Sequence, residues 1–309
     1  MNHRMKRLLR LAALLLLAAL LAGCGQQAAS DTDGQQAQTA LPAEGITALS
    51  LSDDRQVMRF RRDGETWYWQ DDETFPLDQS AMPALLEAAA AMTAAAPVQD
   101  PQDLSAYGLD DAQTSLSVTA DGETLTFTRG DQAASGDWYL RCAEDESVRM
   151  VSDNAVKVFQ LLDGSVYDLA VLPQLPAVTS DTLRTATIQG AAGDPIHIRT
   201  VDGARKVGTR DVTAQTAALV TELSQLAVTA CVDYDPAEGA AAVCGLDAPD
   251  AVLTVTYAAG GKEETLTLKV GAPIGNGGRY VTLSGDASIY RMEETSLVQL
   301  LTLAETGLN

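Results

Sequence analysis

The chain has 309 residues, with 21 Lys or Arg against 42 Asp or Glu, which gives a formal net charge of −21 at pH 7. A protein this acidic is repelled by phosphate backbones, so its composition argues against nucleic-acid binding. The sequence contains only two histidines and four cysteines, which argues against histidine-based metal sites and against a disulfide framework.

The N-terminal segment has the pattern of an export signal. Four basic residues lie within the first ten positions, and an apolar run follows from Leu11 to Ala22. Because this run is shorter than the roughly 20 residues of a membrane-spanning helix, residues 1–23 are predicted to be a cleaved signal peptide. The segment Leu21-Ala22-Gly23-Cys24 resembles the lipobox of bacterial lipoproteins. That resemblance implies cleavage before Cys24 and attachment of fatty acids such as palmitate to its thiol. The alternative is an ordinary secretory signal in which Cys24 has no role.

Residues 24–44 are predicted to form a flexible tether. They are rich in Gln, Ala, Ser and Thr, and no large apolar side chain occurs before Leu41, so they cannot bury enough surface to offset the entropy lost on ordering. A lipid on Cys24 followed by this tether predicts a folded part held at the extracytoplasmic face of the cell membrane. With residues 1–23 removed, 17 basic and 42 acidic residues remain, a net charge of −25. The lipid would hold this charge against repulsion from anionic lipids.

The remainder of the chain reads as one structural unit that occurs twice. Gly108-Leu109-Asp110 and Gly245-Leu246-Asp247 each precede an alternating strand, a hairpin turn, a returning strand and a strand with an aromatic residue at Tyr139 or Tyr280. Each copy then ends in a helix with an apolar stripe. The stripes are Val156, Phe159 and Leu162 in the first copy and Leu297, Leu300 and Leu301 in the second.

The same order of features extends upstream of the Gly-Leu-Asp segments. A hairpin is predicted at Asp63-Gly64 and again at Asp202-Gly203, and an amphipathic helix follows each. The expected N-caps of these helices are Asp78 or Ser80 in the first copy and Asp211 or Thr213 in the second.

Turn chemistry accounts for the repeated segments without any catalytic role. Gly108 and Gly245 are expected to adopt a left-handed conformation after a short helical turn. Leu109 and Leu246 are expected to fill the core, and the aspartates Asp110 and Asp247 to accept hydrogen bonds from local amides. Hairpin turns with positive φ are expected at Asp121-Gly122 and Gly260-Gly261. The glycine-rich segments that begin at Gly130 and Gly271 are expected to be hairpin loops.

These patterns predict an α+β protein with two tandem repeated units, residues 45–170 and 181–309. Each unit is expected to contain a mainly antiparallel, twisted sheet with helices packed on one side. The segment between the units contains two prolines, Pro173 and Pro176.

The repeated arrangement resembles the bacterial family known as DUF4340, a domain of unknown function common in exported lipoproteins. The residues that carry the resemblance are the Tyr-Gly-Leu-Asp segment from Tyr107, the alternating strand and glycine-rich hairpin after it, the Trp138-Tyr139 and Arg279-Tyr280 strands, and the terminal helix. The resemblance covers most of the chain from about Ile46 onward. It implies an envelope protein, with some relatives linked to ABC-type export or gliding-motility systems. It brings no catalytic residue to this chain.

Individual side chains give little support for catalysis. His197 alternates with Ile196 and Ile198 and is expected on the exposed side of a strand, without the partners of a catalytic triad. Cys231 and Cys244 could form a disulfide or remain buried free thiols. No cofactor and no metal site is predicted. Acidic residues are abundant, but no pair stands out as the two carboxylates of a hydrolase.

Three functions remain in order of preference. The first is a lipid-anchored, non-catalytic module that binds another envelope protein, such as part of an ABC-type transport system. The second is a surface lipoprotein that binds carbohydrate or cell wall through Trp67 and Trp69, which lie on one face of a predicted strand and are either core residues or an exposed platform. A carboxylate-dependent hydrolase is the third.

Overall fold

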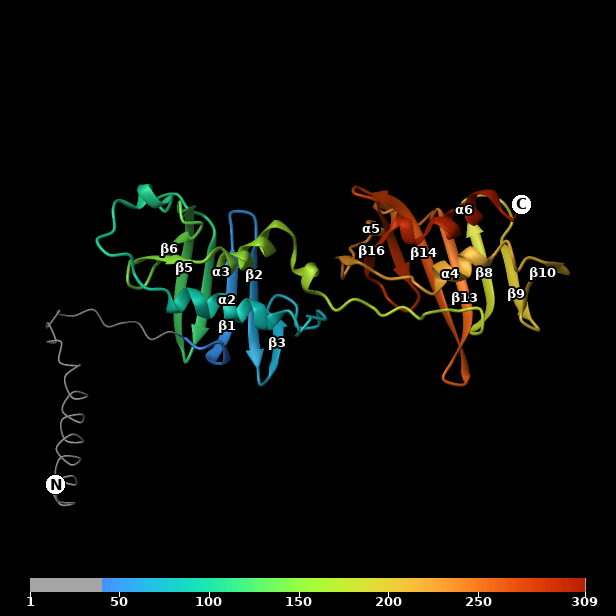
Figure 1. Cartoon of the computed structure of the whole chain (residues 1–309), viewed down its shortest axis with the longest axis horizontal. Coiled ribbons are helices and arrows are strands. Elements are labelled where there is room, and N and C mark those ends of the chain that lie inside the picture. The colour runs from blue at the N-terminus through green and yellow to red at the C-terminus, as the bar shows by residue number, and fades with distance from the viewer. Residues whose placement is uncertain (1–40, 309) are drawn as a thin grey trace, which may run out of the picture. The chain divides into compact units, whose positions relative to one another are not determined.

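The computed structural model describes residues 41–308 (Figure 1). The predicted signal peptide, Cys24 and the tether up to residue 40 lie outside the described residues. At the start of the described chain, a short 3₁₀ helix, η1 (Ala43–Gly45), leads into the first strand. The amide of Leu41 donates a hydrogen bond to Thr93 Oγ1 at 3.0 Å. None of the helices between residues 41 and 308 is both long enough and apolar enough to cross a membrane.

The first sheet has seven strands in the order β3-β2-β1-β4-β5-β6-β7, and all neighbours are antiparallel. Two meanders of consecutive strands are joined where β1 pairs with β4, and there Leu49 lies opposite Val118 and Leu51 opposite Leu116. These four side chains are buried. The strands are β1 (Ile46–Ser52), β2 (Val57–Asp63), β3 (Thr66–Trp69), β4 (Ser115–Ala120), β5 (Glu123–Gln132), β6 (Trp138–Cys142) and β7 (Val148–Val151).

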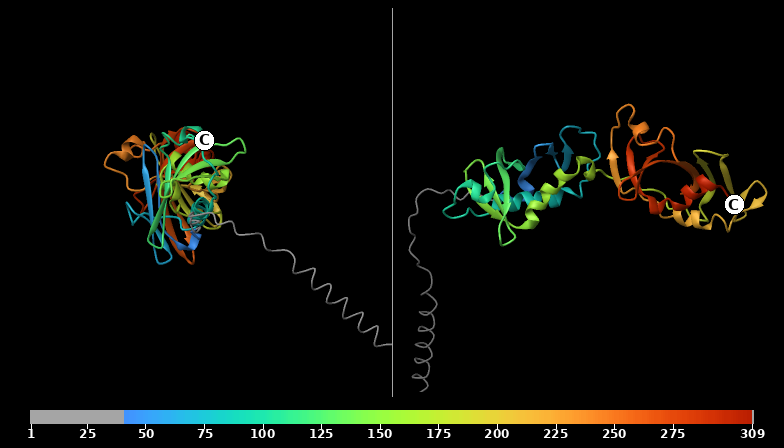
Figure 2. Two further views of the ribbon diagram at one scale, coloured as in Figure 1. Left: turned by 90° about the vertical axis from the view of Figure 1, so that its left-hand side faces the viewer. Right: turned by 90° about the horizontal axis from the view of Figure 1, so that it is seen from above.

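Helices cover one face of this sheet (Figures 1 and 2). The long helix α2 packs beside a terminal helical segment that begins as an α-helix and continues as a 3₁₀ helix. The predicted apolar stripe of that segment is confirmed, because Val156, Phe159 and Leu162 are all buried. The helices are α2 (Met82–Ala94), η2 (Leu104–Tyr107), α3 (Asp153–Val156), η3 (Lys157–Asp163) and η4 (Val166–Leu169).

The second sheet repeats this arrangement with additional short strands. Its order is β11-β10-β9-β8-β13-β14-β15-β16-β12, again antiparallel between all neighbours. The strands are β8 (Leu183–Gly190), β9 (Ile196–Val201), β10 (Ala204–Val207), β11 (Arg210–Asp211), β12 (Ala230–Asp233), β13 (Ala251–Ala259), β14 (Lys262–Ile274), β15 (Gly278–Leu283) and β16 (Ile289–Glu293). The helices are α4 (Ala217–Leu223), α5 (Ala240–Val243), η5 (Glu294–Ser296) and α6 (Val298–Thr306). The α+β class with two tandem antiparallel sheets is therefore confirmed.

The terminal helix of the second unit differs in one residue from the predicted stripe. Leu297 and Leu300 are fully buried, whereas Leu301 is partly exposed and Leu303 is buried in its place. Leu303 lies three residues after Leu300 and shares its face, whereas Leu301 directly follows Leu300 and lies at the edge of that face, partly buried against the core.

The hairpin turns have the backbone geometry that the sequence predicts. Asp121 and Gly122 have φ of 51° and 82°, and Gly260 and Gly261 have φ of 56° and 83°. Two successive residues with positive φ match the right-handed twist of the flanking strands.

The expected helix caps are wrong in both units. Helix α2 follows Ala81, and α4 follows Thr216, in each case without a side-chain capping bond. Asp78 Oδ1 instead accepts a hydrogen bond from the Ser80 amide, and Asp211 Oδ1 accepts one from the Thr213 amide. A short carboxylate two residues before an amide closes a local turn more readily than it reaches a helix that starts later.

The Gly-Leu-Asp turns have the predicted left-handed backbone conformation, and each packs against a glycine of a later strand. Gly108 and Gly245 have φ of 65° and 68°, and the following leucines are buried. Gly130 and Gly271 lie directly against these turns. A Cβ on Gly130 would collide with the Tyr107 carbonyl oxygen, and one on Gly271 with the Cys244 carbonyl oxygen.

The glycine-rich segments contain the expected hairpin loops, between β5 and β6 and between β14 and β15. Their first residues, Gly130 and Gly271, lie within strands β5 and β14. They are glycines because another backbone approaches them closely. The expectation for the aspartates is wrong, because Asp110 and Asp247 are exposed and neither accepts a hydrogen bond from the described residues.

Candidate functional site

The two tryptophans proposed as a platform belong to the first unit's packing. Trp67 is 4% exposed and forms part of the core. Trp69 is partly exposed and packs edge-on against Phe75 and Tyr167, with ring centroids at 5.4 and 6.4 Å. The two rings thus form no exposed platform. Of the two alternatives that the sequence left open, the structure supports the one in which these tryptophans are packing residues.

The histidine and the cysteines of the described residues are not arranged as a reactive site. His197 is exposed on β9, as expected, and its Nδ1 lies 3.2 Å from Thr187 Oγ1. Cys142, Cys231 and Cys244 are buried and form no disulfide. Burial raises the pKa of Cys142 and Cys231 to about 11, so these thiols stay protonated at neutral pH. Between residues 41 and 308, no cluster of His, Cys, Asp or Glu could hold a metal ion.

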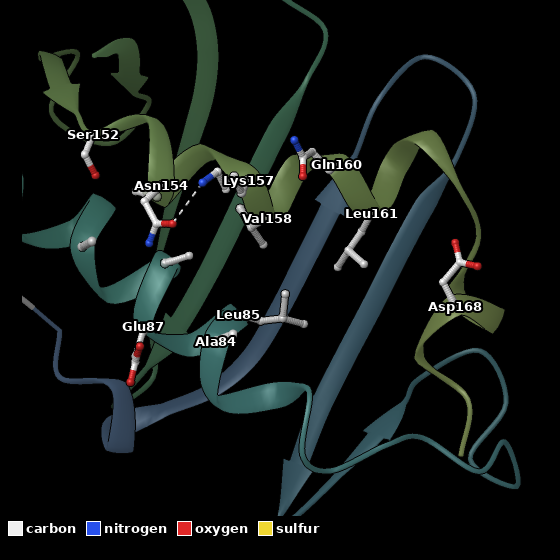
Figure 3. Close-up of a pocket in the computed structure, with 13 residues that line it drawn as sticks. Ala84, Leu85, Glu87, Ser152, Asn154, Lys157, Val158, Gln160, Leu161 and Asp168 are labelled. Atoms are coloured by element: carbon white, nitrogen blue, oxygen red, sulfur yellow. Dashed lines mark hydrogen bonds between the residues drawn. The ribbon is translucent and has the colours of Figure 1, made fainter. Parts of the chain in front are cut away.

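A groove of about 490 Å³ lies between α2 and the α3–η3 segment of the first unit. Small side chains of α2 (Ala84, Ala88 and Ala91) form one wall. Figure 3 shows Leu85, Val158 and Leu161 directed into the space between the two helical segments. The polar residues around the groove are Glu87, Ser152, Asn154, Lys157, Gln160 and Asp168.

The second unit has an equivalent groove of about 380 Å³ between α4 and α6. The two grooves are lined from matching positions. Residues 84, 87, 88 and 91 of α2 correspond to 218, 221 and 222 of α4 and to 225 just after it. Residues 154, 155, 157 and 158 correspond to 295, 296, 298 and 299.

The two grooves differ at most of their matching positions, and one of these differences joins the two helices of the second groove. Ala88 in the first groove is replaced by Glu222 in the second. The Glu222 carboxylate crosses to α6 and accepts hydrogen bonds from the amides of Gln299 and Leu300, at 2.7 and 2.9 Å. These amides belong to the first turn of α6, which has no side-chain cap of its own. Glu222 therefore bridges the second groove and caps its helix, whereas the first groove stays open.

Replacing Glu222 with Ala is expected to lower the free energy of unfolding by about 1–2 kcal/mol, because two amides at the start of α6 lose their acceptor. Glu87→Ala is the matched control, since that carboxylate accepts no hydrogen bond from the described residues, and its effect should stay within about 0.5 kcal/mol. Urea unfolding of the full chain measures both. Equal effects would show that Glu222 is not a cap.

A second matched pair lies before the last strand of each sheet. In the first unit, Asp145 Oδ1 accepts from the Ser147 amide, and its Oδ2 accepts from Arg149 at 2.7 Å. In the second unit, Asp286 Oδ1 accepts from the Ser288 amide, and its Oδ2 accepts from the Tyr290 hydroxyl at 2.6 Å. In both networks the carboxylate accepts from the serine amide and from the side chain two residues after that serine, which is a buried cation in the first unit and a buried phenol in the second.

The comparison with known families agrees with this duplicated structure. The family model described as Domain of unknown function (DUF4340) matches residues 67–229 and again residues 211–306. The chain belongs to the DUF4340 family. The first DUF4340 match begins in β3 and ends just before β12, and the second runs from β11 into α6. No curated protein and no solved structure matches the chain.

Neither the grooves nor the Asp-x-Ser networks were predicted from the sequence. They depend on contacts between helices distant in sequence, such as Glu222 with Gln299. The signal that could have found the second pair is the recurrence of Asp-x-Ser at the same distance before the last strand, at Asp145 and Asp286.

Proposed function

We propose that this DUF4340 protein is a lipid-anchored, extracytoplasmic accessory protein that binds another envelope protein, such as a component of an ABC-type transport system. Its lipid anchor is Cys24, and its binding surface is the groove of the first unit. The partner contributes a short apolar segment that lies between α2 and η3.

The observation that carries the proposal is the contrast between the two grooves. Two duplicated units have the same groove at matching positions, and only the second is bridged by a carboxylate from its own chain. The first groove exposes Ala84, Ala88 and Ala91 beside Leu85 and Leu161. Small side chains of this kind let another backbone approach closely, which favours a helix or an extended segment as occupant.

A substitution copied from the second unit tests this proposal. Ala88→Glu places in the open groove the carboxylate that Glu222 supplies in the other unit. The full chain, tagged and expressed in its native membranes, would be crosslinked and its partners identified by mass spectrometry. One membrane protein is expected to crosslink to the unmodified chain and at least tenfold less to Ala88→Glu. Ala218→Glu, at the edge of the second groove, is the matched control and should crosslink normally.

Two results would contradict the proposal. Equal crosslinking of the unmodified and Ala88→Glu chains would place the partner elsewhere. Equal recovery of the partner from a Cys24→Ala chain released from the membrane fraction would show that anchoring is not needed for the interaction. The thermal midpoint of each variant, measured in parallel, separates loss of binding from loss of folding.

A further inference from the structure

Arg129 of the first unit is held between two aromatic rings. Its guanidinium carbon lies 5.3 Å from the centroid of Trp138 and 5.2 Å from that of Phe159. Stacking of this kind fixes the plane of the guanidinium and leaves its N–H groups directed outward at the edges. Within residues 41–308, no carboxylate or carbonyl accepts a hydrogen bond from the Arg129 side chain.

Arg129 lines a pocket of about 270 Å³ between the β1–β2 loop and the end of η3. Five charged side chains line this pocket, namely Asp53, Asp54, Arg55, Arg129 and Asp163. Asp53 is already paired with Arg55, at 2.7 Å. Asp54 and Asp163 are exposed and interact with Arg55 only through their charges, without a hydrogen bond or salt bridge to any described residue. Three carboxylates and two guanidinium groups give the lining a net charge of −1.

The second unit provides an internal comparison. Arg279 takes the place of Trp138 in its repeat and also lines a pocket. This arginine is neutralised by the chain itself, through Asp250 and through Glu294 at 3.1 Å. Three alanines line the loop and helix side of that pocket, where the first unit has three aspartates. They are Ala191, Ala192 and Ala304.

We infer that the Arg129 pocket binds a small amino acid that carries an additional ammonium group. The ligand's carboxylate takes the place at Arg129 that Asp250 and Glu294 fill for Arg279, because a guanidinium edge matches a carboxylate in geometry and charge. Its ammonium groups face Asp54 and Asp163. A ligand of net charge +1 balances the lining, and the acidic protein attracts it. This ligand site is separate from the groove between α2 and η3.

The test is isothermal titration of the purified full chain with L-lysine and with 1,5-diaminopentane, which is lysine without its carboxylate. L-lysine is expected to bind at least tenfold more tightly, since a hydrogen-bonded charge contributes about that factor. Arg129→Gln should remove the difference between the two compounds. Arg279→Gln, the matched variant in the second unit, should preserve it.

Three outcomes would overturn the inference: no heat from L-lysine up to millimolar concentrations, equal affinity for both compounds, or an unchanged difference in Arg129→Gln. If Arg129→Gln fails to fold, Asp163→Asn tests the site instead. This variant should fold normally, because Asp163 is exposed and its side chain forms no hydrogen bond with the described residues. It should weaken both compounds roughly tenfold. Unchanged affinities would then reject the site.

Discussion

Replacing Asp145 with Asn is expected to lower the free energy of unfolding by about 3 kcal/mol, because the buried cation of Arg149 loses the carboxylate that compensates its charge. Arg149 is 2% exposed. Its guanidinium also donates to the Thr93 carbonyl at 3.0 Å and lies 5.4 Å from the centroid of Phe127. Neither of these two contacts compensates the charge as a carboxylate does. The expected loss lies at the lower end of the usual range because Asp145 is 36% exposed on its side chain.

The second unit supplies the matched control. Asp286 occupies the same place, but its partner is the neutral Tyr290 hydroxyl, whose pKa is raised to about 12 by burial and by the Asp286 hydrogen bond. Asp286→Asn should therefore cost only about 1 kcal/mol, the usual effect of one hydrogen bond. Chemical unfolding curves of both variants give the comparison. A loss as large at Asp286 as at Asp145 would show that charge compensation at Arg149 is not the cause.

The same ion pair predicts how stability depends on pH. Burial acts to raise the pKa of Asp145, but the hydrogen bonds from Ser147 and the ion pair with Arg149 outweigh it and lower the pKa to about 2. A pKa lowered in the folded state stabilises the fold above the unfolded value of about 4. That contribution is lost as pH falls from about 4 to about 2. Asp145→Asn should flatten the decline in unfolding free energy over this window, measured by urea titration at each pH.

Replacing Gly271 with Ala is expected to cost about 2–3 kcal/mol, because the added methyl group collides with a backbone carbonyl that cannot move without displacing the turn. That carbonyl belongs to Cys244, and the Leu246 side chain closes the space beside it. Gly130→Ala in the first unit should have a loss of similar size, since the Tyr107 carbonyl stands in the same relation to it.

Gly275→Ala is the control for this effect. Gly275 follows directly after β14, has no atom within 4 Å of the position of an added Cβ, and does not have positive φ. Alanine there should leave stability unchanged or raise it by a few tenths of a kcal/mol, through the reduced entropy of the unfolded chain. Thermal melts of the three variants measure the series. A Gly271→Ala chain that melts with Gly275→Ala would show that the turn and the strand are not in contact.

Local chemistry explains which parts of the fold the sequence could predict. Asp-Gly and Gly-Gly turns and alternating strands depend on neighbouring residues, so the hairpin before each long helix and the meander after it were predictable. The additional strands β1 and β8, which join these parts into one sheet, were not. The helix caps were not, because Asp78 and Asp211 had a nearer amide to bind. The requirement for glycine at position 271 was not predictable, because the Cys244 carbonyl that faces it lies 27 positions earlier in the chain.

The candidate sites depended even more on distant contacts. Glu222 and Gln299 are separated by 77 positions, and neither local sequence predicts the hydrogen bond between them. The role of Trp67 was undecided from sequence, since alternation alone assigns it to a face without saying whether that face is covered. The sequence shows that Arg279 replaces Trp138 in the second unit, but the role of either residue depends on the side chains that contact it in the fold.

The entry of the chain into the first sheet has a mechanical consequence. Any tension on the N-terminal segment reaches the folded part through residue 41, which is bonded to Thr93, and then through β1. Strand β1 is an interior strand, with backbone hydrogen bonds to β2 on one side and to β4 on the other. A force along the axis of β1 acts on both rows of backbone hydrogen bonds at once, so that many bonds must break together before the strand slides. The load on the N-terminal segment is therefore shared by two rows of backbone hydrogen bonds.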